Sequence, residues 1–326
     1  MIRTLLRGGM AASFATGLAW AQAPVQTPAE APAAAPAPVE TPQPRPPRAY
    51  RTPEEGFAAL ADAARRANVG ALAVVMGDVG VRLLRSGDRV ADAATLRNFA
   101  AAYDAKREIL RSSPDRATIQ VGEDGWPLPI PMVQRGGSWR FDARAGSREI
   151  VDRRIGHNEL DTIETLRAIV DAQQDFAATA GRQGAFRTYA RRFFSTPGQR
   201  DGLYWETQPG QPESPLGPVM AAASSGGYAR TPGDRPQPYH GYLFRILESQ
   251  GPSAPGGAMD YVVNGRMIGG FAVIASPAIY GASGIMTFMA GHDGTVWQKD
   301  LGPGTAREAA GITSFDPGEG WARVPD

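Results

Sequence analysis

Three histidines carry most of the acid–base chemistry that this sequence can offer. His240 stands between Tyr239 and Gly241. Because imidazole titrates near neutral pH, His240 could act as a general base if a carboxylate lies close enough to orient it. Asp201 and Asp260 are the carboxylates that we consider as its catalytic partners. The alternative is a purely structural hydrogen bond, which we favour because sequence distance says nothing about the space between these groups.

A second polar group is formed by His157, Asn158 and Glu159. It could be a metal or acid–base cluster. The interpretation that we favour is the start of a helix, with Asn158 as its N-cap and Glu159 placed favourably against the helix dipole. The third histidine, in the pair His292-Asp293, is typical of a hairpin turn rather than of a ligand pair.

No motif of an established enzyme class accompanies these residues. Ser214, Ser249 and Ser283 lack the GxSxG surroundings of a nucleophile elbow. The sequence has no cysteine, no HExxH, no Walker A loop and no DxDxDG calcium loop. The sequence therefore predicts neither a metal ion nor a cofactor, and it favours a protein that is not an enzyme.

Aromatic residues in loops rich in proline and glycine are the stronger candidates for binding. Trp126 lies in a run in which every second residue is proline, and Tyr204 and Trp205 form a compact turn. With Tyr239 and His240, these side chains could stack on a sugar or hold a peptide. The alternative, which we favour, is that they pack the loops onto a sheet.

The elements that must position these residues indicate an α+β fold. The predicted organisation is a signal peptide (1–21), a disordered Pro/Ala-rich linker (22–50), an N-terminal α+β domain (51–147) and a second α+β domain (148–326). In the second domain, a long helix packs on a four-stranded antiparallel sheet, whose last hairpin turns at Asp293-Gly294.

Helices are predicted from apolar periodicity and capping residues. Thr52 and Glu55 form a capping box. Further helices are predicted at 91–110, 148–155, 159–180, 186–194 and, after a Pro-rich cap, 214–225. The long helix, 159–180, is expected to bury one stripe, made of Leu160, Ile163, Leu166, Ile169, Val170, Gln173, Phe176 and Ala177.

The N-terminus predicts export to the periplasm or beyond. Two arginines, a short apolar stretch and the sequence Ala19-Trp20-Ala21 favour cleavage after Ala21. The formal charge is +1, and removing Arg3 and Arg7 lowers it to −1, so nothing attracts a nucleic acid. No later segment reads as a transmembrane helix.

Three resemblances add to this interpretation. Helices followed by a hairpin ending in GGSWRFD resemble the cone of nuclear-transport-factor-2-like modules. The long helix followed by GYLFRIL, FAVIASP, IMTFMAG and DGTVWQK resembles the globular half of type IV pilin-like and pseudopilin-like proteins. Nearly the entire mature chain, through RRIGHNEL, DGLYW, SPLGP, PYHGYLFRILESQGPSAPGGAMDY, VNGRMIGGFA, SGIMTF and KDLGP, resembles the exported bacterial family "domain of unknown function 2950". That last resemblance implies export and a shared architecture, and no reaction.

These observations leave three functional hypotheses. The leading one is a non-enzymatic exported module that binds an envelope protein or a glycan through the aromatic loops. The second is a hydrolase that uses His240 with a nearby aspartate. The third is a pilin-like structural or assembly accessory subunit.

Overall fold

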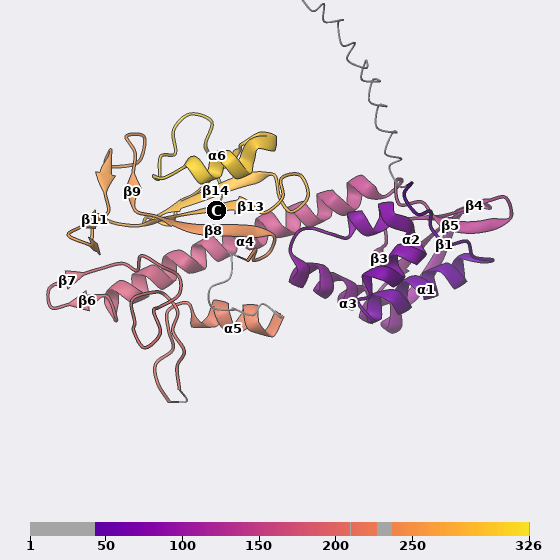
Figure 1. The fold of residues 1–326 in the computed structure, drawn as a ribbon, viewed down its shortest axis with the longest axis horizontal. Helices are drawn as coiled ribbons and strands as arrows, with labels where there is room; N and C mark the ends of the chain where they lie inside the picture. The colour runs from indigo at the N-terminus through magenta and orange to yellow at the C-terminus, as the bar shows by residue number, and fades with distance from the viewer. Residues whose placement is uncertain (1–42, 209, 227–236, 326) are drawn as a thin grey trace, which may run out of the picture. The chain divides into compact units, whose positions relative to one another are not determined.

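The computed structural model describes residues 43–208, 210–226 and 237–325. The predicted signal peptide and most of the predicted linker lie outside these ranges. The described chain contains both α-helices and antiparallel β-sheets, and this combination confirms the predicted α+β class (Figure 1). Among the described residues, no helix combines the length and the apolar character that crossing a membrane requires.

Three capped helices open the N-terminal half: α1 (Pro53–Arg65), α2 (Val69–Leu83) and α3 (Arg89–Ala105). The predicted cap is present at α1, where the Glu55 backbone N–H donates to Thr52 Oγ1 at 3.2 Å. The helix predicted at 91–110 was too long. Leu110 is 37% exposed and lies in a strand, because the chain after Ala105 pairs with its neighbour along the sheet.

An antiparallel sheet packs against these helices with the strand order β1-β2-β4-β5, and β3 pairs with β2. The strands are β1 (Arg107–Ser113), β2 (Arg116–Val121), β3 (Trp126–Pro127), β4 (Met132–Arg135) and β5 (Ser138–Phe141). Their inward side chains, among them Ile119, Met132 and Trp139, form one hydrophobic core with Phe57 of α1. The end of the predicted linker joins this core, since Tyr50 is buried and its N–H donates to the Trp139 carbonyl at 2.9 Å.

The long helix α4 (Ser147–Ala178) is continuous over 32 residues. The helices predicted at 148–155 and 159–180 are therefore one helix that continues through Gly156, and the predicted N-cap at Asn158 was wrong. A glycine inside a helix costs only about 1 kcal/mol relative to alanine, and the buried neighbours Ile155 and Asn158 hold the helix together across it. Glu159 faces the sheet, where its Oε1 accepts from the backbone N–H groups of Ile285 (2.9 Å) and Met286 (3.0 Å).

The buried face of α4 includes the polar residues Asn158 and Thr162 before its apolar stretch from Leu166. Leu160 was predicted to be buried and is 64% exposed, while Leu166 and Phe176 are buried as predicted and Ile163 is partly buried. Asn158 takes the inward position, and two residues correspond to about 200° around a helix, so Leu160 must face outward. The buried positions are Ile155, Asn158, Thr162, Leu166, Ile169, Val170, Ala172, Gln173, Phe176 and Ala177.

The C-terminal sheet lies between α4 and α6 (Thr305–Gly311) (Figure 1). Its strand order is β16-β15-β14-β13-β8. The four strands β8, β13, β14 and β15 form the predicted antiparallel meander. The predicted hairpin at Asp293-Gly294 is confirmed, with a φ of +80° at the glycine. The strands are β8 (Tyr242–Leu247), β13 (Ala272–Pro277), β14 (Met286–Gly291), β15 (Val296–Asp300) and β16 (Ala322–Arg323).

Short elements surround this sheet. The helix predicted at 186–194 is absent from this described stretch, where a small hairpin turns at Gly184 (φ +64°) and leaves Phe186 66% exposed. The helix predicted at the proline-rich segment after Ser214 is present. The remaining elements are β6 (Arg182–Gln183), β7 (Phe186–Arg187), α5 (Gly217–Gly226), β9 (Ser249–Gln250), β10 (Met259–Asp260), β11 (Val262–Val263), β12 (Arg266–Met267) and η1 (Gly302–Gly304).

Candidate binding cavity

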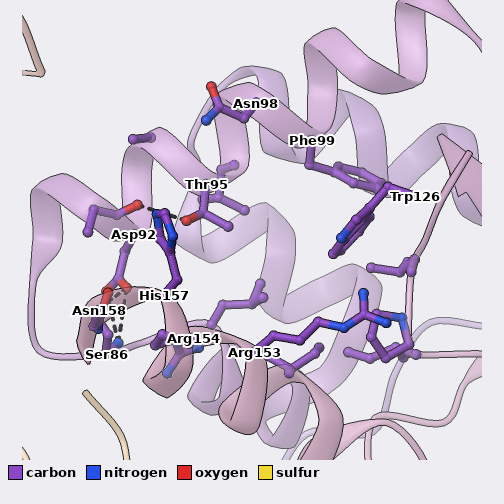
Figure 2. Close-up of a pocket in the computed structure, with 18 of the residues that line it drawn as sticks. Ser86, Asp92, Thr95, Asn98, Phe99, Trp126, Arg153, Arg154, His157 and Asn158 are labelled. Atoms are coloured by element: carbon purple, nitrogen blue, oxygen red, sulfur yellow. Dashed lines mark hydrogen bonds between the residues drawn. The ribbon is translucent and has the colours of Figure 1, made fainter. Parts of the chain in front are cut away.

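A cavity of about 480 Å³ lies between α3, the loop that follows β3, and the first half of α4. Volumes of this size accommodate a small organic molecule. Figure 2 shows Phe99 and Trp126 at one end and Ser86 and Asp92 at the other, with His157 between them. The apolar lining residues are Leu60, Met76, Leu84, Val90, Ala91, Ala94, Leu96, Phe99, Trp126, Leu128, Pro129, Ile130 and Ile150.

Helix α3 supplies one wall of the cavity. All 17 of its residues are described, and only Ala100 and Tyr103 are buried. Leu96 and Phe99 pack against the N-terminal core and remain partly exposed where they line the cavity. Their exposed apolar surface is available for contact with a ligand.

The aromatic end of the cavity is held by Arg153 of α4. Its guanidinium lies over the Trp126 ring, 5.2 Å from the centroid, and donates to the Pro127 carbonyl at 3.1 Å. Its Nε also donates to Glu149 Oε1 at 2.6 Å. Trp126 is 43% exposed, so this arrangement fixes an accessible indole at the wall.

The opposite end is polar and centred on Asp92. Ser86 donates to Asp92 Oδ1 through its backbone N–H at 3.0 Å and through its hydroxyl at 2.7 Å. Burial raises the pKa of Asp92, and the two Ser86 hydrogen bonds oppose that rise because they stabilise the carboxylate.

Arg154 closes the floor beneath Asp92. Its guanidinium donates to the backbone carbonyls of Leu83, Arg85 and Ala282. Burial lowers the pKa of Arg154, and the charge of Asp92 acts in the opposite direction. Three backbone carbonyls accept from this arginine, so it joins α4 to the segments on either side of it.

A turn places His240 at the cavity. The turn residues His240 (φ +49°) and Gly241 (φ +75°) both have positive φ, and the flanking Tyr239 and Tyr242 exchange backbone hydrogen bonds. Positive φ at both central residues is characteristic of type I′ hairpin turns. Histidine is one of the few residues with a side chain that tolerate this conformation, which explains how the position can carry an imidazole.

Two histidines meet one carboxylate beside the cavity. Asp161 Oδ2 lies 2.9 Å from His240 Nδ1 and 3.3 Å from His157 Nε2. The Asp161 side chain is 22% exposed and that of His240 is 33%, whereas His157 is 76% exposed and lies at the rim. Burial raises the pKa of Tyr239, and the negative charge of Asp161 raises it further. The Tyr239 ring packs edge-on against His240.

The turn is hydrogen-bonded to the N-cap of α3 and approaches α4 closely. Gly241 N–H donates to Asp88 Oδ2 at 3.1 Å, and Asn158 Nδ2 donates to the Ser283 carbonyl at 2.8 Å. A Cβ on Gly241 would lie 2.6 Å from Asn158 Nδ2, so only glycine fits this approach. Asp88 is also the N-cap of α3, so it connects the turn to the open wall of the cavity.

The predicted site residues therefore fall into two groups. Trp126 and His240 line the cavity, and Tyr239 contacts His240. Tyr204 and Trp205 instead pack against the C-terminal core. Asp201 accepts from the Thr196 N–H at 2.7 Å, and Asp260 is exposed in β10; neither lines the cavity.

The carboxylate beside His240 is Asp161, which the sequence reasoning missed. The spacing of His157 and Asp161, four residues apart on one helix, was a signal that could have found it. Asp92 and Arg154 were missed as well. Across the described residues, no cluster of three or more His, Asp or Glu side chains is arranged to hold a metal ion.

The fold and the cavity define an α+β protein in which one long helix carries a ligand-sized site between its first half and α3. The chain belongs to the family described as "Protein of unknown function (DUF2950)", whose model matches residues 47–324. No curated protein and no solved structure matches the chain, and the pilin-like resemblance is not confirmed. Two segments that carry the family resemblance, 153–160 and 238–261, supply Arg153, Arg154, His157 and His240 to the cavity.

Proposed function

We propose that this chain is an exported, non-enzymatic binding module of the periplasm or cell surface, and that its partner binds in the cavity between α3 and α4. The observation that carries the proposal is the partly exposed apolar wall of α3, which faces Trp126 across a cavity of about 480 Å³. The leader-like N-terminus and the Pro-rich linker support the exported location.

An apolar segment of an envelope protein suits this cavity better than a glycan. Sugar hydroxyl groups need many hydrogen-bonding partners, and the lining is dominated by Leu, Ile, Ala, Met and aromatic side chains. Trp126 alone provides the kind of accessible indole on which a sugar ring stacks. A glycan therefore remains the second candidate partner.

The test is a pull-down from an envelope extract with purified wild type and two aromatic variants. Trp126→Ala removes the aromatic end of the cavity, whereas Phe186→Ala removes a more exposed aromatic ring from the β6–β7 hairpin, outside the cavity. We expect Trp126→Ala to lose the partner and Phe186→Ala to keep it. Equal recovery by both variants, or an empty pull-down together with an empty glycan array, contradicts the proposal.

The exported location has its own test. N-terminal sequencing of the protein from the periplasmic or culture fraction should give Gln22 as the first residue, as expected for cleavage after Ala21. Recovery of the intact N-terminus from the cytoplasm alone contradicts it.

A hydrolase is the second candidate function, favoured by the 2.9 Å approach of His240 Nδ1 to Asp161 Oδ2. A carboxylate at Nδ1 orients an imidazole so that the other ring nitrogen can take a proton from water. Both residues can be exchanged with little change in shape: His240→Asn keeps a side chain that tolerates positive φ, and Asp161→Asn is isosteric. Hydrolysis of a chromogenic ester panel that either variant abolishes would support this function, and an inactive wild type would rule it out for those substrates.

A further inference from the structure

We propose that the group that occupies the cavity is electrically neutral and mainly apolar. This inference rests on the proposed function, since it names the chemistry of what the same cavity binds. The observation behind it is that the protein itself pairs the charged side chains that line the cavity.

The arginines of the lining are already engaged. Arg153 pairs with Glu149 at 2.6 Å, and Arg154 donates to three backbone carbonyls beside Asp92. The Arg153 charge is offset by Glu149 and the Arg154 charge by the nearby Asp92, so an anionic ligand would meet no uncompensated positive charge in the lining.

The acidic side is engaged in the same way. Asp92 accepts two hydrogen bonds from Ser86 and lies beside Arg154, so its charge is already compensated within the protein. Asp161 lies outside the lining and faces both histidines. A cationic ligand would therefore compete with Arg154 for Asp92, or with His157 and His240 for Asp161.

A charged ligand would consequently bury its charge without compensation, which is costly in an apolar environment. A neutral apolar ligand instead gains from contact with Leu96, Phe99 and Trp126, because apolar surface leaves water on both partners. Thr95 and Asn98 add hydrogen-bonding groups at one edge of the lining, so a single hydroxyl, carbonyl or amine on the ligand can be accommodated.

A pair of dyes separates charge from shape. Phenylnaphthylamine is neutral, and anilinonaphthalene sulfonate has the same ring skeleton with an added anionic sulfonate. We expect saturable one-to-one binding of the neutral dye, followed by its fluorescence, and binding of the sulfonate at least about tenfold weaker. Equal or tighter binding of the sulfonate overturns the inference, and so does the absence of saturable binding of the neutral dye.

Two tryptophan substitutions on α3 locate the dye. Ala94→Trp fills the cavity from its open wall, whereas Ala101→Trp adds the same side chain on an exposed position of the same helix. We expect Ala94→Trp to weaken the neutral dye at least about tenfold and Ala101→Trp to leave it unchanged. The far-ultraviolet circular dichroism and melting temperature of each variant establish that it is folded. A folded Ala94→Trp protein that binds as the wild type does shows that the dye lies elsewhere, which overturns the inference.

The two proposals can fail separately. If the pull-down depends on Trp126 while the neutral dye does not bind, the binding module stands and its ligand is not of this class. If the dye binds in the cavity and no envelope partner is captured, the ligand class stands and the partner is not an envelope protein.

Discussion

Replacement of Gly241 by alanine tests whether the turn that carries His240 is held by its contact with α4. Gly241 has a φ of +75°, and a Cβ at this position would lie 2.6 Å from Asn158 Nδ2 and 3.0 Å from Ser283 Cβ. The substitution therefore meets two separate obstacles. One is the backbone conformation, and the other is the hydrogen bond from Asn158 to the Ser283 carbonyl.

The structure gives a magnitude for each obstacle. A residue with a Cβ in the left-handed region costs roughly 1–2 kcal/mol relative to glycine. Displacing the buried Asn158 amide from its carbonyl partner costs about 1–3 kcal/mol more, because both groups lose a hydrogen bond away from water. Gly241→Ala should therefore lower the free energy of unfolding by about 2–5 kcal/mol.

Gly281→Ala is the matched control. Gly281 has nearly the same φ, +71°, and nothing lies within 4 Å of the Cβ that would be added. This control should lose only the backbone contribution, roughly 1–2 kcal/mol. Urea unfolding followed by circular dichroism measures both variants, and Asn158→Ala in the Gly241→Ala background should recover part of the difference, since the alanine removes the amide that is displaced. Equal losses in the two glycine variants would refute the reasoning, because the contact with α4 would then contribute nothing.

Three further sets of substitutions test other parts of the structure. Arg154→Met should lower the free energy of unfolding by about 1–3 kcal/mol because it leaves partly buried carbonyls without a donor, while Arg153→Met, whose ion pair is partly exposed, should cost about 1 kcal/mol or less in the same urea titration. Burial raises the pKa of Asp92 in the folded protein, so the stability that its protonated form contributes is present at low pH and is lost as the pH rises through the raised pKa. The free energy of unfolding of the wild type, relative to that of Asp92→Asn, should therefore fall as the pH rises above about 4, and a difference that is constant with pH contradicts the burial of this group. Leu160→Ser should change stability by no more than about 0.5 kcal/mol and Leu166→Ala should cost about 2–5 kcal/mol; similar losses in thermal unfolding would contradict the observed face of α4.

Local signals in the sequence predicted the elements whose ends are set by neighbouring residues. The N-cap at Thr52 and the Asp293-Gly294 turn each depend on a few consecutive side chains, and both are present, although Glu55 accepts from the Arg51 N–H instead of completing the predicted capping box. The order of strands in the C-terminal meander follows from the same turns. The α+β class was predictable in part because the strand pairs are antiparallel and β13, β14 and β15 follow one another as hairpins.

Long-range contacts decided the features that the sequence did not predict. Asn158 resembles an N-cap because its side chain commonly accepts from the backbone, yet its amide instead donates to the Ser283 carbonyl, which is far away in the sequence. The strand β1 was assigned to a helix because Leu110 continued the apolar periodicity of α3, and only pairing with β2 makes it a strand. Tertiary contacts outweigh local propensity in both cases.

The candidate site was only half predictable for the same reason. Trp126 and His240 could be identified by residue type and by the loops that hold them. Asp161 could not be connected to His240, because the two become neighbours only when the turn docks on α4. The pairing of charges at Asp92 and Arg154, on which the ligand class depends, likewise follows from the tertiary structure alone.

The continuity of α4 links the fates of the two hydrophobic cores. Ile150, near the start of the helix, packs against the N-terminal core, and Leu166 lies in the C-terminal one. The backbone between them is shared, so a helix that frays from one side loses contacts on the other. Heat should consequently melt both halves in a single cooperative transition, and the amide protons between Ile155 and Leu166 should be among the last to exchange with deuterated solvent.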